Sequence, residues 1–160
     1  MKDWITVHSL KMDEDIDQQF LVVDASVILA AILPQEAHAK IALTFIKRST
    51  NERKKLIAPS ILLYEVFNAV RSAILSKRIS EDEARVILAA YTTIEPIYID
   101  FSLLSQNALK VALESDCSVY DAAYAALAHE RECSMCTLDK KLIQKLKVFP
   151  VNVIYLGERL

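Results

Sequence analysis

The stretch that most constrains the fold is residues 20–31, FLVVDASVILAA, an apolar run interrupted by one carboxylate, Asp24. The residues before Asp24 are typical of a short strand buried on both faces, and the apolar residues after Ser26 recur at helical spacing. Asp24 is therefore predicted to lie where a strand ends and a helix begins. Ligands of open parallel sheets bind outside the carboxyl ends of the strands, so this acid is placed for chemistry. Alternatively, Asp24 caps the helix, a position that Asp and Ser both favour.

The rest of the chain continues this alternation of short apolar strands and amphipathic helices. Strands are predicted at 56–58, 96–100, 134–138 and 151–156, and helices at 36–48, 60–77, 80–93, 102–114, from 118 onward and at 140–146. Ser80 and Glu83 have the spacing of a capping box at the start of one helix. The alternation predicts an α/β fold, a three-layer α/β/α sandwich around a central, mainly parallel sheet.

Length and composition predict one domain in a reducing compartment. At 160 residues the chain fits a single domain over 20–160, preceded by an N-terminal extension over 1–19 that carries an acidic run. The longest nearly apolar stretch, 20–33, is too short to span a bilayer, and the N-terminus lacks the pattern of a signal peptide. Three cysteines, an odd number, do not suggest a disulfide framework. We therefore expect a cytoplasmic protein with no membrane segment.

The chain has a single glycine, Gly157. This excludes a P-loop, a GxGxxG dinucleotide turn and a GxSxG nucleophile elbow, because each needs glycine for close backbone approach or a strained turn. The sequence also has no HExxH motif, and its three histidines are scattered. The remaining chemistry is expected to depend on carboxylates.

Glu65 is a charged residue in a helical segment, ILLYEVFNAV, that is apolar nearly all round. A charged carboxylate in such surroundings costs several kcal/mol unless it is paired or bound to a cation. One interpretation is an ion pair with Arg71 or another base. Asn68, one turn further along the same face, could orient the carboxylate.

Two further acids follow the same logic as Asp24. Asp121 occupies the third position of the helix that starts after Ser118, and Asp139 directly follows a predicted strand. Each of them has an alternative role at a helix start. If the helix of Glu65 packs against the same edge of the sheet, the four carboxylates converge. They would then need cations, and oxygen-only ligands select Mg²⁺ or Mn²⁺.

Four segments, VVDASVILA, YEVFNAV, VYDAAYAALA and CTLDKKL, occur in this order along the chain. Together they resemble the PIN-domain ribonucleases, including the VapC-like toxins of prokaryotic toxin–antitoxin pairs. The resemblance runs from Phe20 to about Leu156, and the extension before Phe20 departs from it. It implies a PIN-like fold, an Mg²⁺- or Mn²⁺-dependent endoribonuclease that leaves 5′-phosphate and 3′-hydroxyl ends, and an antitoxin partner. The metal-binding acids would be Asp24, Glu65, Asp121 and Asp139, with Ser26 and Thr137 as the small hydroxyl residues beside them.

Two other functions are compatible with parts of the sequence. A PIN-like module could process RNA, or could hold RNA or a protein without cutting, although such a scaffold has no need of four convergent acids. A metal-dependent phosphatase would favour a second Asp two residues after the first, where this chain has Ser26. A net charge of −2 gives no general attraction to RNA, so phosphate contacts must be local. Candidates for them are Arg71, Lys77, Arg78, Lys140 and Lys141.

The apolar fraction predicts a shared surface. It is 53%, which is high for a small domain that carries 25% charged residues. The largely apolar helices at 60–77 and 80–93 are the candidates for this surface. We therefore expect a homodimer.

Overall fold

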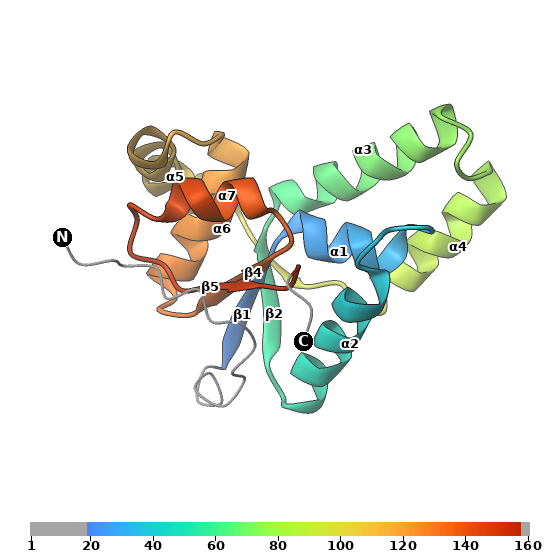
Figure 1. The fold of residues 1–160 in the computed structure, drawn as a ribbon, viewed down its shortest axis with the longest axis horizontal. Coiled ribbons are helices and arrows are strands. Elements are labelled where there is room, and N and C mark those ends of the chain that lie inside the picture. The colour runs from blue at the N-terminus through green and yellow to red at the C-terminus, as the bar shows by residue number, and fades with distance from the viewer. Residues whose placement is uncertain (1–18, 158–160) are drawn as a thin grey trace.

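A computed structural model of the chain describes residues 19–157; predictions for 1–18 and 158–160 lie outside the described residues. Its centre is a five-stranded sheet in the order β3-β2-β1-β4-β5, and every pair of neighbours is parallel (Figure 1). The strands are β1 (Phe20–Val23), β2 (Lys55–Pro59), β3 (Ile97–Ile99), β4 (Ser134–Thr137) and β5 (Val153–Tyr155). The predicted parallel sheet is confirmed.

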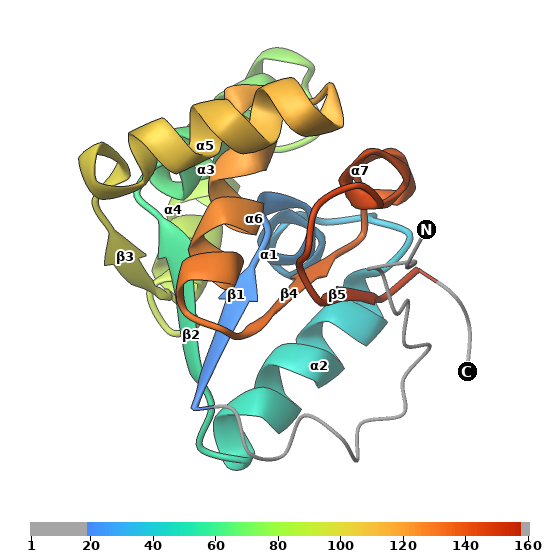
Figure 2. The same ribbon diagram turned by 90° about the vertical axis from the view of Figure 1, so that its left-hand side faces the viewer.

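Helices cover both faces of this sheet (Figures 1 and 2). One face carries α1 (Ala25–Ile32), α2 (Ala39–Asn51), α3 (Ile61–Leu75) and α4 (Glu81–Tyr91). The other face carries α5 (Phe101–Ser115), α6 (Val119–Glu130) and α7 (Lys140–Leu146). This is the predicted three-layer α/β/α sandwich. Within residues 19–157, no helix combines the length and the apolar character needed to cross a membrane.

Helix α6 is buried between the sheet and α5. Residues 122–128 of α6 are all buried, and the helix contacts β1, β2 and β4. Five of these seven residues are alanine, whose small side chain lets a helix approach a sheet closely. Tyr124, one of the few large side chains of α6, is fully buried here.

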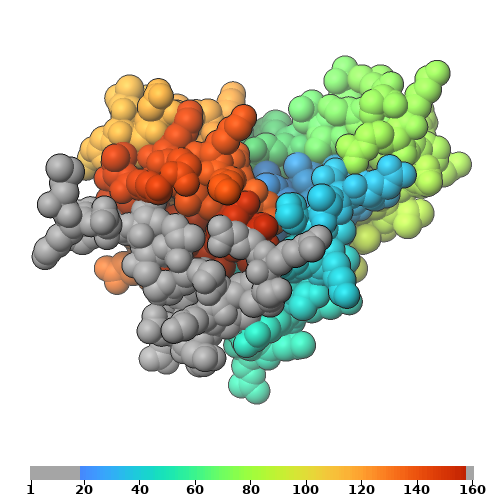
Figure 3. All heavy atoms as spheres, in the orientation of Figure 1, coloured from blue at the N-terminus to red at the C-terminus, as the bar shows by residue number. Residues whose placement is uncertain are grey.

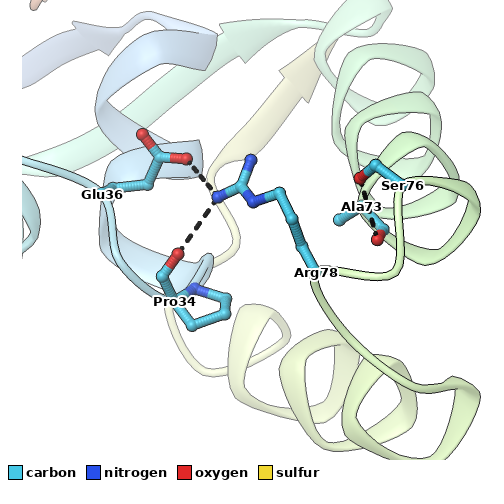
Figure 4. Close-up of polar contacts among 5 residues, drawn as sticks. All are labelled: Pro34, Glu36, Ala73, Ser76 and Arg78. Carbon is cyan, nitrogen blue, oxygen red and sulfur yellow. Dashed lines mark hydrogen bonds and ion pairs between the residues drawn. The ribbon is translucent and has the colours of Figure 1, made fainter.

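The α3–α4 hairpin shares a smaller apolar cluster with the end of α1 and has a polar tie to the α1–α2 connection. Arg78, in the turn between the two helices, donates from Nη2 to the Pro34 carbonyl at 3.1 Å and to Glu36 Oε1 at 2.9 Å (Figure 4). The predicted capping box at the start of α4 is present, with Ser80 and Glu83 bonding each other reciprocally. The hairpin that carries Glu65 is thus braced against the α1–α2 connection.

The bounds of α2 differ from the predicted 36–48. The helix begins at Ala39 and continues to Asn51. Its start is delayed because Gln35 adopts a left-handed φ of 65° and residues 34–36 form the turn held by Arg78. Its end is extended because the Thr50 hydroxyl bonds back to the Ile46 carbonyl, so this polar residue is accommodated within the helix.

Left-handed backbone recurs at residues other than glycine. Positive φ values are found at Gln35, Arg53, Lys77, Asp116 and Glu132. These positions follow or end helices, where other chains commonly place glycine. Each left-handed residue with a side chain costs about 1 kcal/mol, a cost that follows from the scarcity of glycine in this sequence.

Candidate functional site

The order of the strands creates a crevice at the carboxyl ends of β1 and β4. These two strands are neighbours, but the chain leaves β1 toward β2 and leaves β4 toward β5, in opposite directions. Connections that diverge in this way leave an opening, and ligands of open parallel sheets bind there. The space-filling view shows the surface notched between the part formed by α5, α6 and α7 and the part formed by α3 and α4 (Figure 3). Asp24 directly follows β1, at this edge of the sheet.

Asp24 is buried and is held by two hydroxyl groups. It stands at the N-cap position of α1, yet its side chain makes no capping hydrogen bond. Instead, Ser26 Oγ and Thr137 Oγ1 each donate to Asp24 Oδ2 at 2.6 Å. The side chain is only 5% exposed, and burial raises the pKa of Asp24 above its ordinary value. The helix-cap interpretation of Asp24 is therefore wrong for its carboxylate.

The two hydroxyls are themselves fixed by the backbone. The Leu138 N–H donates to Ser26 Oγ, and the Asp139 N–H donates to Thr137 Oγ1, both at 2.9 Å. Because each hydroxyl oxygen already accepts an N–H, its own proton is directed at Asp24. Both residues thus lie beside the acid, as the resemblance implied.

Glu65 projects from the second turn of α3 and accepts a hydrogen bond from the Tyr124 hydroxyl at Oε2. Among the described residues no ion pair joins Glu65 to Arg71 or to any other base, so the alternative interpretation of Glu65 as an ion-pair partner is wrong. Burial raises the pKa of Glu65 from 4.5 to about 7, with smaller contributions from the charges of Asp24 and Asp121. The Tyr124 hydroxyl lowers it in part.

Asp121 occupies the third position of α6, as predicted. Its N–H donates to Ser118 Oγ at 3.1 Å, and the Ser118 hydroxyl donates to Asp121 Oδ2 at 2.8 Å. The negative charge of Asp121 contributes to the raised pKa of both Asp24 and Glu65. Three of the four predicted acids therefore lie within electrostatic reach of one another.

Asp139 and Asn68 are placed differently. Asp139 Oδ1 accepts from the backbone N–H groups of Lys141 and Leu142, at 2.7 and 3.0 Å, so this carboxylate caps α7. Its link to the other acids runs through its own N–H, which binds Thr137. Asn68 is exposed on α3 and forms no hydrogen bond with Glu65 in the described structure.

Tyr124 and Ser118 are the two residues of this site that the sequence-based site prediction did not include. Tyr124 lies three positions after Asp121, which puts the two side chains on the same face of α6. That spacing, visible in VYDAAYAALA, was the available signal for Tyr124. Ser118, after which the helix was predicted to start, caps α6, and its hydroxyl in addition holds the carboxylate of Asp121.

The donor set fits a hard divalent cation in its chemistry. Asp24, Glu65 and Asp121 offer only oxygen, the ligand that Mg²⁺ and Mn²⁺ prefer. The raised pKa values of Asp24 and Glu65 reflect in part the unbalanced negative charge around them, which a cation would offset. Within residues 19–157, no three His, Cys, Asp or Glu side chains are gathered as closely as they would be around a bound ion. Binding would therefore require side-chain movements that bring the carboxylate oxygens together.

Comparison with known proteins identifies the family. The PIN domain family matches residues 21–147 of the chain. The chain is 31% identical to ribonuclease VapC3 of Pyrobaculum aerophilum over 141 residues, which cover 83% of this chain and 97% of the relative. It is 33% identical to ribonuclease VapC1 of Mycobacterium tuberculosis over 124 residues, which cover 76% of this chain and 86% of that protein.

Solved structures give the same result for the fold. The crystal structure of PAE2754 from Pyrobaculum aerophilum matches with a TM-score of 0.61 at 25% identity, covering 93% of this chain and 92% of that one. The structure of VapBC2 from Rickettsia felis, bound to a DNA fragment from their promoter, matches with a TM-score of 0.62 at 15% identity, covering 85% and 98%. The latter likeness concerns the fold alone. From its sequence, its sheet topology and these matches, the chain belongs to the PIN domain family.

Proposed function

We propose that the chain is an Mg²⁺- or Mn²⁺-dependent ribonuclease that hydrolyses phosphodiester bonds of RNA. The observation that carries the proposal is the buried carboxylate of Asp24, held by two hydroxyls at the crevice between β1 and β4 and facing the negative charges of Glu65 and Asp121. Asp139 would complete the set of four acids by turning its free oxygen toward the crevice. The similarity to proteins named ribonuclease VapC supports RNA as the substrate.

Each residue would have a distinct part in the reaction. Asp24, fixed by Ser26 and Thr137, would provide a rigid ligand, while Glu65 and Asp121 would approach the ion from the two helix layers. When bound, a divalent ion lowers the pKa of a water molecule and stabilises charge on the leaving oxygen. Around neutral pH, Glu65 holds a proton in a sizeable fraction of metal-free molecules, because its pKa is about 7. The residue would give up this proton as the ion binds.

Contacts to the RNA backbone would be made by cations near the crevice. Lys140 and Lys141 are exposed at the start of α7, directly after Asp139, and Arg71 is exposed on α3. Lys77 is also exposed but lies beyond the C-terminal end of α3, farther from the crevice (Figure 1). Arg78 is less available because it is already bonded to Glu36 and Pro34. We expect the products to carry 5′-phosphate and 3′-hydroxyl ends.

We also propose a cytoplasmic homodimer that is the toxin of a toxin–antitoxin pair. Exposed aromatic side chains on α3, Tyr64 at 74% and Phe67 at 54%, together with exposed Leu75 and Val86, support an apolar surface shared between two copies. The relatives are VapC proteins, which supports an antitoxin as a further partner. A chain that binds no antitoxin but still cuts would instead act in RNA processing.

A cleavage assay with matched acid variants tests this proposal. The purified protein is incubated with an end-labelled single-stranded RNA in Mn²⁺, in Mg²⁺ and in EDTA. We expect cleavage with either ion, none in EDTA, and none for Asp24→Asn. Asp82→Asn is the control, because Asp82 is exposed on α4 and, among residues 19–157, pairs with Arg85 alone.

The outcomes separate the candidate functions. Cleavage that persists in EDTA or in Asp24→Asn would contradict the proposed site. RNA binding with no cleavage under any metal condition would favour the non-cleaving module.

A further inference from the structure

Tyr124 contributes its ring to the hydrophobic core and its hydroxyl to a site carboxylate. Its side chain is fully buried, with 0% exposure, and its hydroxyl donates to Glu65 Oε2. Tyr124 belongs to α6 and Glu65 to α3, which lie on opposite faces of the sheet. The hydrogen bond therefore joins the two helix layers beyond the carboxyl edge of the strands.

The hydrogen bonds to three of the acids follow one pattern. Asp24 receives the Ser26 and Thr137 hydroxyls on Oδ2, Asp121 receives the Ser118 hydroxyl on Oδ2, and Glu65 receives the Tyr124 hydroxyl on Oε2. In each case the hydroxyls meet a single oxygen, and the other oxygen takes no part in these bonds. In each of these three acids, hydroxyl groups thus anchor one oxygen of the carboxylate.

Glu65 needs such an anchor more than the other acids do. It is half-buried rather than fully buried, has more rotatable bonds than Asp, and is repelled by the charges of Asp24 and Asp121. Without a donor, rotamers that point the carboxylate to solvent would gain in population. Tyr124, whose side chain is fully buried, offsets that tendency.

We propose that Tyr124 is a positioning residue that pre-organises Glu65 for binding of the divalent cation. The inference rests on the proposed function, since it requires Glu65 to be a ligand. Groups that orient metal ligands typically contribute a factor of about 10 to 100 in metal affinity or activity. Tyr124 acts through Glu65 and contacts neither the ion nor the RNA.

The test measures Mn²⁺ binding to the full chain. The electron paramagnetic resonance signal of free Mn²⁺ reports how much of the ion remains unbound. Tyr124→Phe removes the hydroxyl and keeps the ring, so we expect it to fold and to raise the Kd for Mn²⁺ by about tenfold or more. Tyr91→Phe is the matched control, because Tyr91 is also buried and its hydroxyl bonds another residue, Tyr98, but no site acid. It should change the Kd by less than about twofold.

A double-substitution cycle shows whether the hydroxyl acts through Glu65. In the Glu65→Gln background, which has already lost the ionic ligand, Tyr124→Phe should cause little further loss of Mn²⁺ affinity. In RNA cleavage, Tyr124→Phe should raise the Mn²⁺ concentration at half-maximal rate and leave most of the rate at saturating metal. A role limited to stability would lower the melting temperature of both Phe variants and leave the Kd unchanged.

A second measurement needs no substitution at Tyr124. In the parent chain, saturation with Mg²⁺ should change the near-ultraviolet absorbance of tyrosine, because the partner of the Tyr124 hydroxyl becomes a metal ligand. The change should persist in Tyr91→Phe. Its absence from a parent that binds Mg²⁺ would contradict the inference.

Different results would contradict the metal-dependent function and the role of Tyr124. A parent chain that leaves the free Mn²⁺ signal unchanged would overturn the metal-dependent function and the inference with it. A parent that binds Mn²⁺ and a folded Tyr124→Phe variant with the same Kd would overturn the inference alone. The inference would also be overturned if Tyr124→Phe lowered the Mn²⁺ affinity as much in the Glu65→Gln background as it does in the parent.

Discussion

Neutralising Glu65 should stabilise the metal-free protein, although it removes a residue of the proposed site. Glu65→Gln keeps the size of the side chain and an amide oxygen that can accept from the Tyr124 hydroxyl. What it removes is the negative charge beside Asp24 and Asp121. The variant therefore isolates the cost of placing that charge in a partly buried position.

The magnitude follows from the pKa of Glu65, which rises from 4.5 to about 7 on folding. At about 1.4 kcal/mol for each pH unit, ionised Glu65 would destabilise the fold by about 3 kcal/mol. Because the side chain is half-buried, solvent screening reduces this to about 1 to 2 kcal/mol. Glu65→Gln should gain this amount, which corresponds to a rise in Tm of about 2–4 °C for each kcal/mol.

The same two pKa values of Glu65 determine how the stability difference between parent and variant changes with pH. Below about pH 4.5 the carboxyl is protonated in the folded and unfolded states, so parent and variant should be equally stable. Between pH 4.5 and about 7 only the unfolded state loses the proton, so the parent loses stability as the pH rises. Above about pH 7 the difference should be constant and at its largest.

Urea unfolding in EDTA at pH 4 and pH 8 measures the effect. Glu132→Gln serves as the control, because Glu132 is an exposed acid in the turn after α6. Saturating Mn²⁺ at pH 8 should shrink or reverse the gain, since the parent binds the ion more tightly. The reasoning is refuted if Glu65→Gln is less stable than the parent in EDTA at pH 8, or if its gain is as large at pH 4.

Three further outcomes can be checked with standard methods. Asp139→Ala should lower the free energy of unfolding in EDTA by about 1 kcal/mol because α7 loses its cap, whereas Asp139→Asn should not; equal losses in urea melts would argue against a capping role. Arg53→Gly should raise stability by up to about 1 kcal/mol, because glycine relieves the left-handed φ of 60°; a lower Tm by calorimetry would contradict this. Light scattering should give a mass about twice the 18.0 kDa of one chain, and Tyr64→Ser combined with Phe67→Ser should reduce it to the monomer; a monomeric parent would exclude the dimer.

The fold could be predicted from local patterns because each strand and helix has its own signal. The apolar run before Asp24 and the capping box at Ser80 both specify structure within a few residues. Parallel strands linked by helices then leave few topologies, since such crossovers are right-handed. The bounds of α2 were less predictable, because its start depends on Arg78, which is 42 residues away from its partner Glu36 in the sequence.

The site was predictable only in part, for a related reason. The helix-cap rule describes Asp139 correctly, because the groups that donate to its carboxylate, the N–H groups of Lys141 and Leu142, are its neighbours in the sequence. The same rule fails at Asp24, since Thr137, 113 residues away in the sequence, takes that carboxylate instead. An ion pair with a base was one interpretation of Glu65, and its hydrogen-bond partner is instead Tyr124, at a separation of 59 residues. Contacts of this range come from the topology of the sheet and have no local sequence pattern.

The acids at the crevice between β1 and β4 are proposed to share a divalent cation. An anomalous difference map, which locates bound Mn²⁺ in a crystal, tests this most directly. Crystals of the chain grown with Mn²⁺ should show an anomalous peak bonded to oxygens of Asp24 and Asp121, with Glu65 and Asp139 turned toward it. Crystals of Asp24→Asn grown in the same way should lack the peak. A well-ordered crevice with no peak at saturating Mn²⁺, or a peak bound only to acids elsewhere on the surface, would contradict the account.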